Sequence, residues 1–217
     1  NLAHAEVEFK RANACLRYEY QMIDVEGEES EPMPHVLQNR AEAEFVVAMY
    51  QYLRLCGYPG ERITLLTPYN GQRELLRELL KERCRKNPLF GMPRKVTTVD
   101  KYQGQQNDIV LLSLVRTRSV GYLRDVRRLL VAVSRARLGL YVFGKVSLFR
   151  DCFELRNIVQ LLLQRPCSLQ LVENEYYPCE RGVEDDVPSF EVKNGEHLGQ
   201  IVAQYYEIRR QQWEAMQ

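Results

Sequence analysis

Short apolar runs alternate with stretches of helical periodicity between residues 39 and 165. The apolar runs end at polar or glycine-containing turns and predict buried strands at Arg62–Thr67, Lys95–Val99, Ile109–Val115 and Gly139–Gly144. Helical spacing predicts helices at Asn39–Cys56, Gln72–Arg83, Asp125–Arg137 and Ser147–Leu163. Strands that are apolar on both faces and alternate with helices form parallel sheets covered on both sides. The pattern therefore predicts a three-layer α/β domain.

Local signals mark where several of these helices begin and end. Asn39, followed three residues later by Glu42, predicts a capping box, and Gly57 predicts the end of the same helix. Asp125 lies at the predicted start of a second helix, where the helix dipole favours an anion. The first helix is thus the best-delimited element of the sequence.

The pattern is weaker at both ends of the chain. Residues 1–38 predict an irregular lead-in with a strand around Leu16–Ile23, and residues 166–217 predict a C-terminal extension. In that extension we expect an edge strand at Ser168–Val172, a loop at Tyr176–Gly195 and a terminal helix at His197–Met216. His197 and Trp213 are expected to pack that helix. The predicted domains are thus a lead-in (1–38), a main domain (39–165) and an extension (166–217).

Composition is that of a globular protein, with 45% hydrophobic and 27% charged residues. No apolar run approaches the roughly 20 residues that span a bilayer. The six cysteines form no CxxC pair or Cys/His cluster, so we expect reduced, structural thiols and no metal site. The chain begins with Asn and has no signal-peptide pattern, and we expect it to be part of a longer protein.

Local charge is more informative than the net charge of +1. Five acids between residues 24 and 31 favour a solvated loop. Residues 116–137 contain seven arginines and one acid, Asp125, interrupted at helical spacing by Leu129, Leu130 and Val133. We therefore expect several of these guanidinium groups to be attached to a buried helix.

Three strand-to-loop junctions combine buried strands with polar, glycine-containing residues. They are LLTPYNGQ (65–72), VTTVDKYQGQQNDIVLLSLVR (96–116) and RRLLVAVSRARLGLYVFG (127–144). Because right-handed crossovers place the carboxyl ends of parallel strands at one edge, we expect all three at that edge, where ligands bind. Each junction alone is a weak signal, whereas their order and spacing together are specific.

In that order, the junctions resemble motifs IV, V and VI of superfamily 1 helicases of the nonsense-mediated-decay type, over residues 40–150. The resemblance implies the second of two RecA-like domains, with ATP bound between them and the phosphate-binding loop and Mg²⁺ carboxylates on the first domain. This sequence has no G-x-x-x-x-G-K-[ST] and no acidic pair in a Walker B context. We expect half of an ATP site, without a metal ligand of its own, and no hydrolysis by the chain alone.

The resemblance also implies roles for individual residues. Arg135 matches the arginine that reaches the γ-phosphate and neutralises charge during phosphoryl transfer. Gln103, Gly104 and Gln106 match nucleotide-binding positions. The family usually has Glu where this chain has Gln106, and this departure keeps the hydrogen-bonding capacity but removes a charge that bears on nucleotide affinity and turnover. We expect Arg127 and Arg128 to brace loops or the interdomain face, and Arg128 and Arg137 are equally compatible with surface salt bridges.

A second set of residues matches the nucleic-acid path of the family. Short hydroxyls and backbone N–H groups at strand ends suit phosphate and ribose contact without base recognition. Tyr69 is compatible both with stacking on a base and with packing against its own turn, and Tyr102 is expected to face the core. The predicted RNA-binding residues are Thr67, Pro68, Tyr69, Thr97, Thr98, Val99 and Arg116.

Within the family, the sequence of residues 96–140 most resembles the spliceosomal, intron-binding branch. The resemblance thus implies an ATP-dependent RNA helicase or translocase of the nucleus, with pre-mRNA introns, spliceosomal proteins and the first RecA-like domain as partners and no membrane association. One alternative is a non-hydrolysing RNA-binding or scaffold module, which Gln106 favours. Another is the motor of a DNA-processing relative, because no residue here distinguishes a ribose 2′-hydroxyl.

Overall fold

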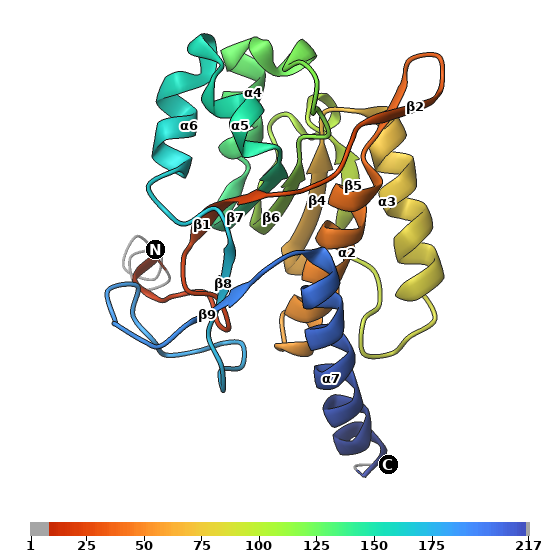
Figure 1. Ribbon diagram of the computed structural model, residues 1–217. Coiled ribbons are helices and arrows are strands. Elements are labelled where there is room, and N and C mark those ends of the chain that lie inside the picture. Colours follow the sequence, from red (N-terminus) through yellow and green to blue (C-terminus); the bar gives the residue numbers. More distant parts are fainter. Residues whose placement is uncertain (1–8, 216–217) are drawn as a thin grey trace.

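The computed structural model describes residues 9–215, and their centre is a five-stranded sheet with the order β1-β7-β6-β4-β5 (Figure 1). Each neighbouring pair of its strands is parallel. The strands are β1 (Tyr20–Asp24), β4 (Ile63–Thr67), β5 (Lys95–Thr98), β6 (Asn107–Ser113) and β7 (Ala136–Gly144). The α/β fold with a mainly parallel sheet is confirmed.

Helices cover both faces of the sheet and create two apolar cores. Successive strand residues alternate between them, so that Leu65 faces one core and Leu66 the other. The first core is completed by α2 (Arg40–Leu55), α3 (Asn70–Arg83) and α7 (Gly195–Glu214). The second is completed by α4 (Val126–Val133), α5 (Val146–Arg150) and α6 (Arg156–Leu162). The main domain therefore has three layers, as its sequence predicts.

The lead-in supplies one edge of the main sheet, because β1 pairs with β7 through Tyr20↔Leu140 and Asp24↔Gly144. The strand expected at Leu16–Ile23 is thus shifted towards the C-terminus, where Met22 and Ile23 are buried on opposite faces. A two-stranded antiparallel ribbon, β2 (Ser30–Met33) and β3 (Val36–Gln38), follows. The boundary at residue 38 remains a prediction, but one strand of the main sheet lies before it.

Two predicted helices are shorter than expected. The helix expected at Asp125–Arg137 ends at Val133, because Ser134 is its C-cap and Arg137 already belongs to β7. The helix expected at Ser147–Leu163 is divided, because Asp151 closes α5 and Cys152 is extended. A 3₁₀ turn, η4 (Phe153–Leu155), then leads into α6. The remaining 3₁₀ turns are η1 (Gly60–Arg62), η2 (Asp100–Tyr102) and η3 (Gly121–Arg124).

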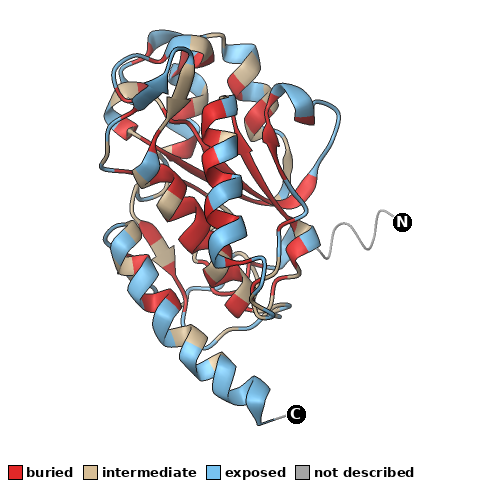
Figure 2. Ribbon diagram, turned by 90° about the vertical axis from the view of Figure 1, so that its right-hand side faces the viewer, coloured by how far each residue is buried: buried red, intermediate tan, exposed pale blue. Residues whose placement is uncertain are grey.

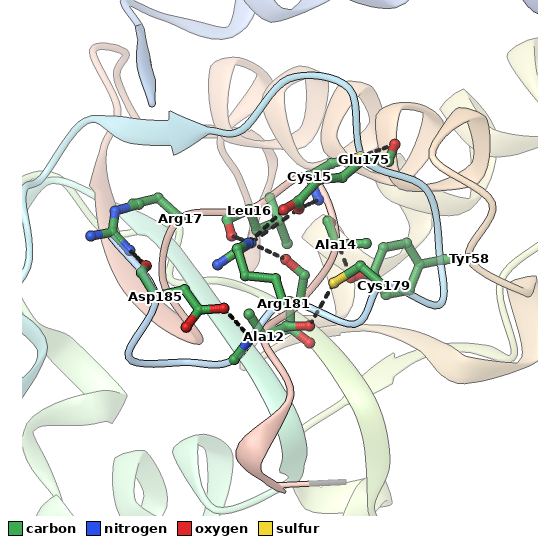
Figure 3. Close-up of polar contacts among 12 residues, drawn as sticks. Ala12, Ala14, Cys15, Leu16, Arg17, Tyr58, Glu175, Cys179, Arg181 and Asp185 are labelled. Carbon is green, nitrogen blue, oxygen red and sulfur yellow. Dashed lines mark hydrogen bonds and ion pairs between the residues drawn. The ribbon is translucent and has the colours of Figure 1, made fainter. Parts of the chain in front are cut away.

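The C-terminal segment packs back onto the beginning of the chain. Its strands β8 (Leu169–Leu171) and β9 (Phe190–Val192) form a small antiparallel sheet, with β9 inside the predicted loop. Arg181 fixes this segment (Figure 3): its Nη2 donates to the carbonyl of Leu16 at 2.7 Å, and its guanidinium is paired with Glu175. The extension is thus tied to the lead-in by the hydrogen bonds that this ion pair, which lies within the extension, makes with Leu16 and Cys15.

The terminal helix α7 packs against the body up to Arg209, and its last residues are exposed. Leu198, Ile201 and Val202 are buried, whereas Ile208 and Trp213 are exposed, so the packing role expected for Trp213 is wrong. Figure 2 shows the C-terminal end of α7 extending from the body of the molecule. The predicted end at Met216 lies outside the described residues. None of the helices among residues 9–215 is long and apolar enough to cross a membrane.

Candidate functional site

The three motif segments lie at two opposite edges of the sheet, and the expectation of a single edge is wrong. Thr67 pairs with Thr98 at the carboxyl ends of β4 and β5, whereas Asn107 pairs with Ala136 at the amino ends of β6 and β7. Residues 99–106 run back across the sheet between these edges, and α4 makes a second crossing before Arg135. We call the two places the carboxyl edge and the amino edge.

Arg135 lies at the amino edge, directly before β7. Its Nε donates to the Val131 carbonyl at 2.8 Å, Nη1 to the Gln105 carbonyl at 3.3 Å and Nη2 to Ser134 Oγ at 2.9 Å. Within residues 9–215 it has no carboxylate partner within salt-bridge distance. Neutral acceptors thus hold the half-buried guanidinium in place without cancelling its charge.

The glutamine-rich loop of motif V lies beside Arg135. Gln103, Gly104 and Gln106 are exposed, and the Gln106 amide lies 3.5 Å from the Ser134 carbonyl. Gly104 has a φ of +76°, and a Cβ there would meet nothing within 4 Å. The left-handed backbone, rather than crowding inside the chain, is therefore the reason for glycine at this position.

Asp108 is a buried acid at the amino edge that the sequence analysis did not identify. It accepts from Arg62 Nη1 at 2.9 Å and from Arg137 Nη1 at 2.7 Å. The salt bridge considered for Arg137 is thus present and joins η1, β6 and β7. No spacing rule could have found it, because Arg62 and Asp108 meet only through the pairing of β4 with β6.

At the carboxyl edge, most of the predicted RNA-binding side chains are buried. This applies to Thr67, Thr97, Thr98 and Val99, whereas Pro68 and Tyr69 are half-buried. Thr67 Oγ1 is within 3.4 Å of the Tyr69 N–H, so that hydroxyl points into its own turn. Any contact of these strand ends with a ligand would therefore use the backbone, together with Pro68 and Tyr69.

Tyr69 packs against a neighbouring segment. Its ring centroid lies 6.3 Å from that of Tyr122, and its buried hydroxyl has no hydrogen-bond partner among the described residues. Burial raises the pKa of Tyr69 to about 12. Tyr102, by contrast, is buried in the core, and its hydroxyl lies 3.2 Å from Thr64 Oγ1, which confirms its predicted orientation.

Arg116 is held beside a buried acid of the lead-in. Its Nε lies 3.4 Å from Glu29 Oε2 and donates to the Ser119 carbonyl at 2.8 Å. Glu29 also accepts from the Thr117 N–H at 2.6 Å. The interpretation of residues 24–31 as a solvated loop is therefore wrong for Glu29, whose carboxylate offsets the charge that we expected Arg116 to offer to RNA.

A buried carboxyl fixes the end of β6 beneath this edge. Glu42 Oε2 accepts from Ser113 Oγ at 2.6 Å and from the Val115 N–H at 2.8 Å. Val115 has a φ of 72°, a strained conformation for a β-branched residue. Asn39 caps α2 by accepting from the Glu42 N–H at 3.1 Å, while Glu42 itself bonds β6 instead of completing the capping box. The first turn of α2 thus holds the strained exit of β6.

Comparison with known proteins gives this geometry a family. Residues 2–147 match a family model described as "AAA domain". The chain is 55% identical to mouse RNA helicase aquarius over 187 residues, which is 83% of this chain and 13% of that protein.

The chain belongs to the superfamily 1 helicases of the nonsense-mediated-decay type.

Two further relatives have names that point to different processes. Pre-mRNA-splicing factor cwf11 of Schizosaccharomyces pombe is 32% identical over 197 residues, 88% of this chain and 15% of that protein. DNA polymerase alpha-associated DNA helicase A of Saccharomyces cerevisiae is 32% identical over 117 residues, 52% of this chain and 16% of that protein. The chain thus spans a small part of these relatives, one of which is named as a DNA helicase.

Proposed function

We propose that this chain is the second RecA-like domain of an ATP-dependent RNA helicase or translocase that acts in pre-mRNA splicing in the nucleus. The supporting observation is Arg135, a guanidinium fixed at the amino edge by neutral acceptors only. Such a group suits stabilisation of the charge that develops on a transferring phosphoryl group. The similarity to aquarius and cwf11 supports splicing and spliceosomal partners, and favours RNA over DNA.

The amino edge fits the polyphosphate of ATP but not its metal ion. ATP with Mg²⁺ supplies the phosphoryl group whose transfer drives such motors. Asp108, a carboxylate close to Arg135 in the sheet, is already paired with Arg62 and Arg137. Within residues 9–215 no cluster of His, Cys, Asp or Glu could hold a metal. Arg135 would therefore meet the γ-phosphate, with Gln103, Gly104 and Gln106 beside the nucleotide, while the first RecA-like domain would hold Mg²⁺.

The carboxyl edge is the proposed RNA path. The RNA would lie against the backbone at Thr67, Thr97, Thr98 and Val99 and against the side chains of Pro68 and Tyr69. This arrangement would place RNA and nucleotide at opposite edges of one sheet. Arg116 would contribute less than its charge suggests, because Glu29 is beside it.

A second candidate is an RNA-binding scaffold without turnover. It is favoured by Gln106, which offers an uncharged amide where the family usually has a carboxylate. The Gln106 amide lies 3.5 Å from the carbonyl of Ser134, the residue before Arg135, so the Gln106 side chain lies beside the proposed finger. Steady-state ATP hydrolysis separates the two candidates, since only the motor turns over.

The half-site makes a specific binding prediction. Titration of Mg²⁺-ATP into this chain alone should show a dissociation constant weaker than about 1 mM, which corresponds to less than about 4 kcal/mol of binding free energy. The reason is that the phosphate-binding loop and metal ligands belong to the other domain. A chain with Arg135→Ala is the matched control and should give the same weak signal. A tight, Mg²⁺-dependent complex of the chain alone would refute the half-site.

A further inference from the structure

Tyr122, in the 3₁₀ turn η3, contacts three of the segments that form the motifs. Its hydroxyl donates to the Asp100 carboxylate, with both oxygens at 2.6 Å. The guanidinium of Arg128 stacks over its ring at 3.5 Å from the centroid, and the Tyr69 ring lies 6.3 Å away. Asp100 follows β5, Tyr69 follows β4 and Arg128 belongs to α4, so one side chain joins motifs IV, V and VI.

These contacts are strong enough to fix one end of α4. A hydroxyl that donates to a carboxylate forms a short, charge-assisted bond, and an arginine stacked on an aromatic ring gains further electrostatic attraction. Burial, followed by the bond to Asp100, raises the pKa of Tyr122 to about 12, so the hydroxyl keeps its proton at neutral pH. Asp125 caps the same helix end by accepting from the Arg127 N–H at 3.1 Å.

Helix α4 runs from this contact to the amino edge. Its span from Val126 to Val133 corresponds to about 12 Å at 1.5 Å per residue. Arg128 lies in its first turns, and Arg135 follows immediately after its C-cap Ser134. Arg135 is moreover bonded back to the helix through the Val131 carbonyl. A displacement of one end of this short helix therefore moves the other.

We propose that Tyr122 is a positioning residue that couples occupancy of the carboxyl edge by RNA to the placement of Arg135 at the amino edge. This inference rests on the proposed function. An RNA strand lying against Pro68 and Tyr69 restrains the Tyr69 ring. The restrained Tyr69 ring limits the movement of Tyr122, and Tyr122 in turn limits the movement of helix α4 through its contact with Arg128. RNA binding thereby reduces the freedom of Arg135 before phosphoryl transfer, which amounts to a coupling free energy between the two sites.

The test uses the natural protein in which this chain is joined to its first RecA-like domain, with single-stranded RNA as the probe. Tyr122→Leu keeps an apolar side chain but removes the ring and the hydroxyl. Arg128→Met keeps a long side chain but removes the charge, at a position whose side chain is 42% exposed and whose replacement should not impair folding. The matched control is Tyr176→Leu, because Arg209 stacks on Tyr176 at 4.7 Å in an equivalent contact that lies outside the group formed by Tyr69, Asp100, Tyr122 and Arg128.

Tyr122→Leu and Arg128→Met should each lower the RNA-stimulated kcat for ATP about tenfold, within the usual range of coupling between sites. The KM for ATP and the RNA concentration giving half-maximal stimulation should change less than about twofold, which a general loss of structure would not allow. Tyr122→Phe, which keeps the stacked ring, should recover part of the rate, and Tyr176→Leu should match wild type.

The possible failures are distinguishable. If RNA stimulates the wild type and both variants equally, the coupling is refuted while the proposed function stands. If RNA affinity falls in proportion to the rate, Tyr122 is an RNA contact and the positioning role is refuted. If RNA fails to stimulate the wild type, the proposed function and the inference fall together.

Discussion

Replacing Arg135 by alanine should lower RNA-stimulated ATP hydrolysis by about a thousandfold or more, the usual contribution of an arginine finger. ATP binding should be largely retained, because the proposed function assigns the phosphate-binding loop and the metal ligands to the first RecA-like domain. The loss should be in kcat, since the guanidinium acts on charge that develops only in the transition state. Turnover and equilibrium nucleotide binding are measured on the protein that joins this chain to its first RecA-like domain.

Two companion variants sharpen this result. Arg135→Lys should remain strongly impaired, because an ammonium group cannot reproduce the planar fork that three acceptors orient here. Arg210→Ala removes an exposed arginine near the end of α7 that pairs with Glu207 at 2.8 Å, and should leave turnover unchanged. Wild-type turnover in Arg135→Ala would end the assignment of the finger.

Replacing Glu42 by alanine should produce the largest loss of stability. The change leaves the Ser113 hydroxyl and the Val115 N–H without their acceptor in the protein interior. Each buried unsatisfied group costs about 1–3 kcal/mol, and Val115 also loses the contact that holds its strained backbone. We therefore expect the free energy of unfolding to fall by about 3 kcal/mol or more. Urea unfolding of the chain measures it as a lower midpoint with an unchanged slope. A fall in the free energy of unfolding no larger than that of an ordinary surface substitution would contradict the role given to the Glu42 hydrogen bonds.

The same carboxyl should make stability depend on pH. Burial raises the pKa of Glu42 from its ordinary value of 4.5 to about 8, against the opposing effect of its hydrogen bonds. Since the folded state holds the proton more tightly, this contribution to stability is complete below the unfolded value and is lost as pH rises to about 8. The free energy of unfolding of wild type should therefore fall over this window relative to Glu42→Gln.

The control for this pH dependence is Glu207→Gln, a change on the exposed part of α7. It should follow the wild-type profile, whereas Glu42→Gln should be flatter because a glutamine has no proton to release. Parallel profiles for wild type and Glu42→Gln would show that the carboxyl does not titrate in this range.

The alternation of apolar runs and helices sufficed to predict the sheet, because strands such as β4 and β6 are buried on both faces and leave a continuous apolar signal. The pattern did not predict that β1 forms an edge of the main sheet, because a strand of five residues does not reveal which strand it pairs with. It extended α4 too far, because SRAR is compatible with a helix until Ser134 Oγ bonds the Val131 carbonyl and the chain turns into β7.

The candidate residues could be placed by motif match, but not their distribution over two edges. Prediction of a common edge assumed that each junction follows the carboxyl end of its strand, whereas residues 99–106 cross the sheet without forming an α-helix. The sequence also did not predict the acidic residues that contact the site. Glu29 meets Thr117, and Glu42 meets Val115, across separations of 88 and 73 residues, which no local pattern reports.

The most direct test of the account is steady-state ATP hydrolysis measured with and without single-stranded RNA on three proteins. These are this chain alone, the first RecA-like domain alone, and the protein that joins them. The account predicts negligible turnover by either half and RNA-stimulated turnover by the joined protein, because Arg135 and the phosphate-binding loop complete one site only when they face each other. Equal turnover by the first domain alone, or none by the joined protein at saturating RNA, would contradict it.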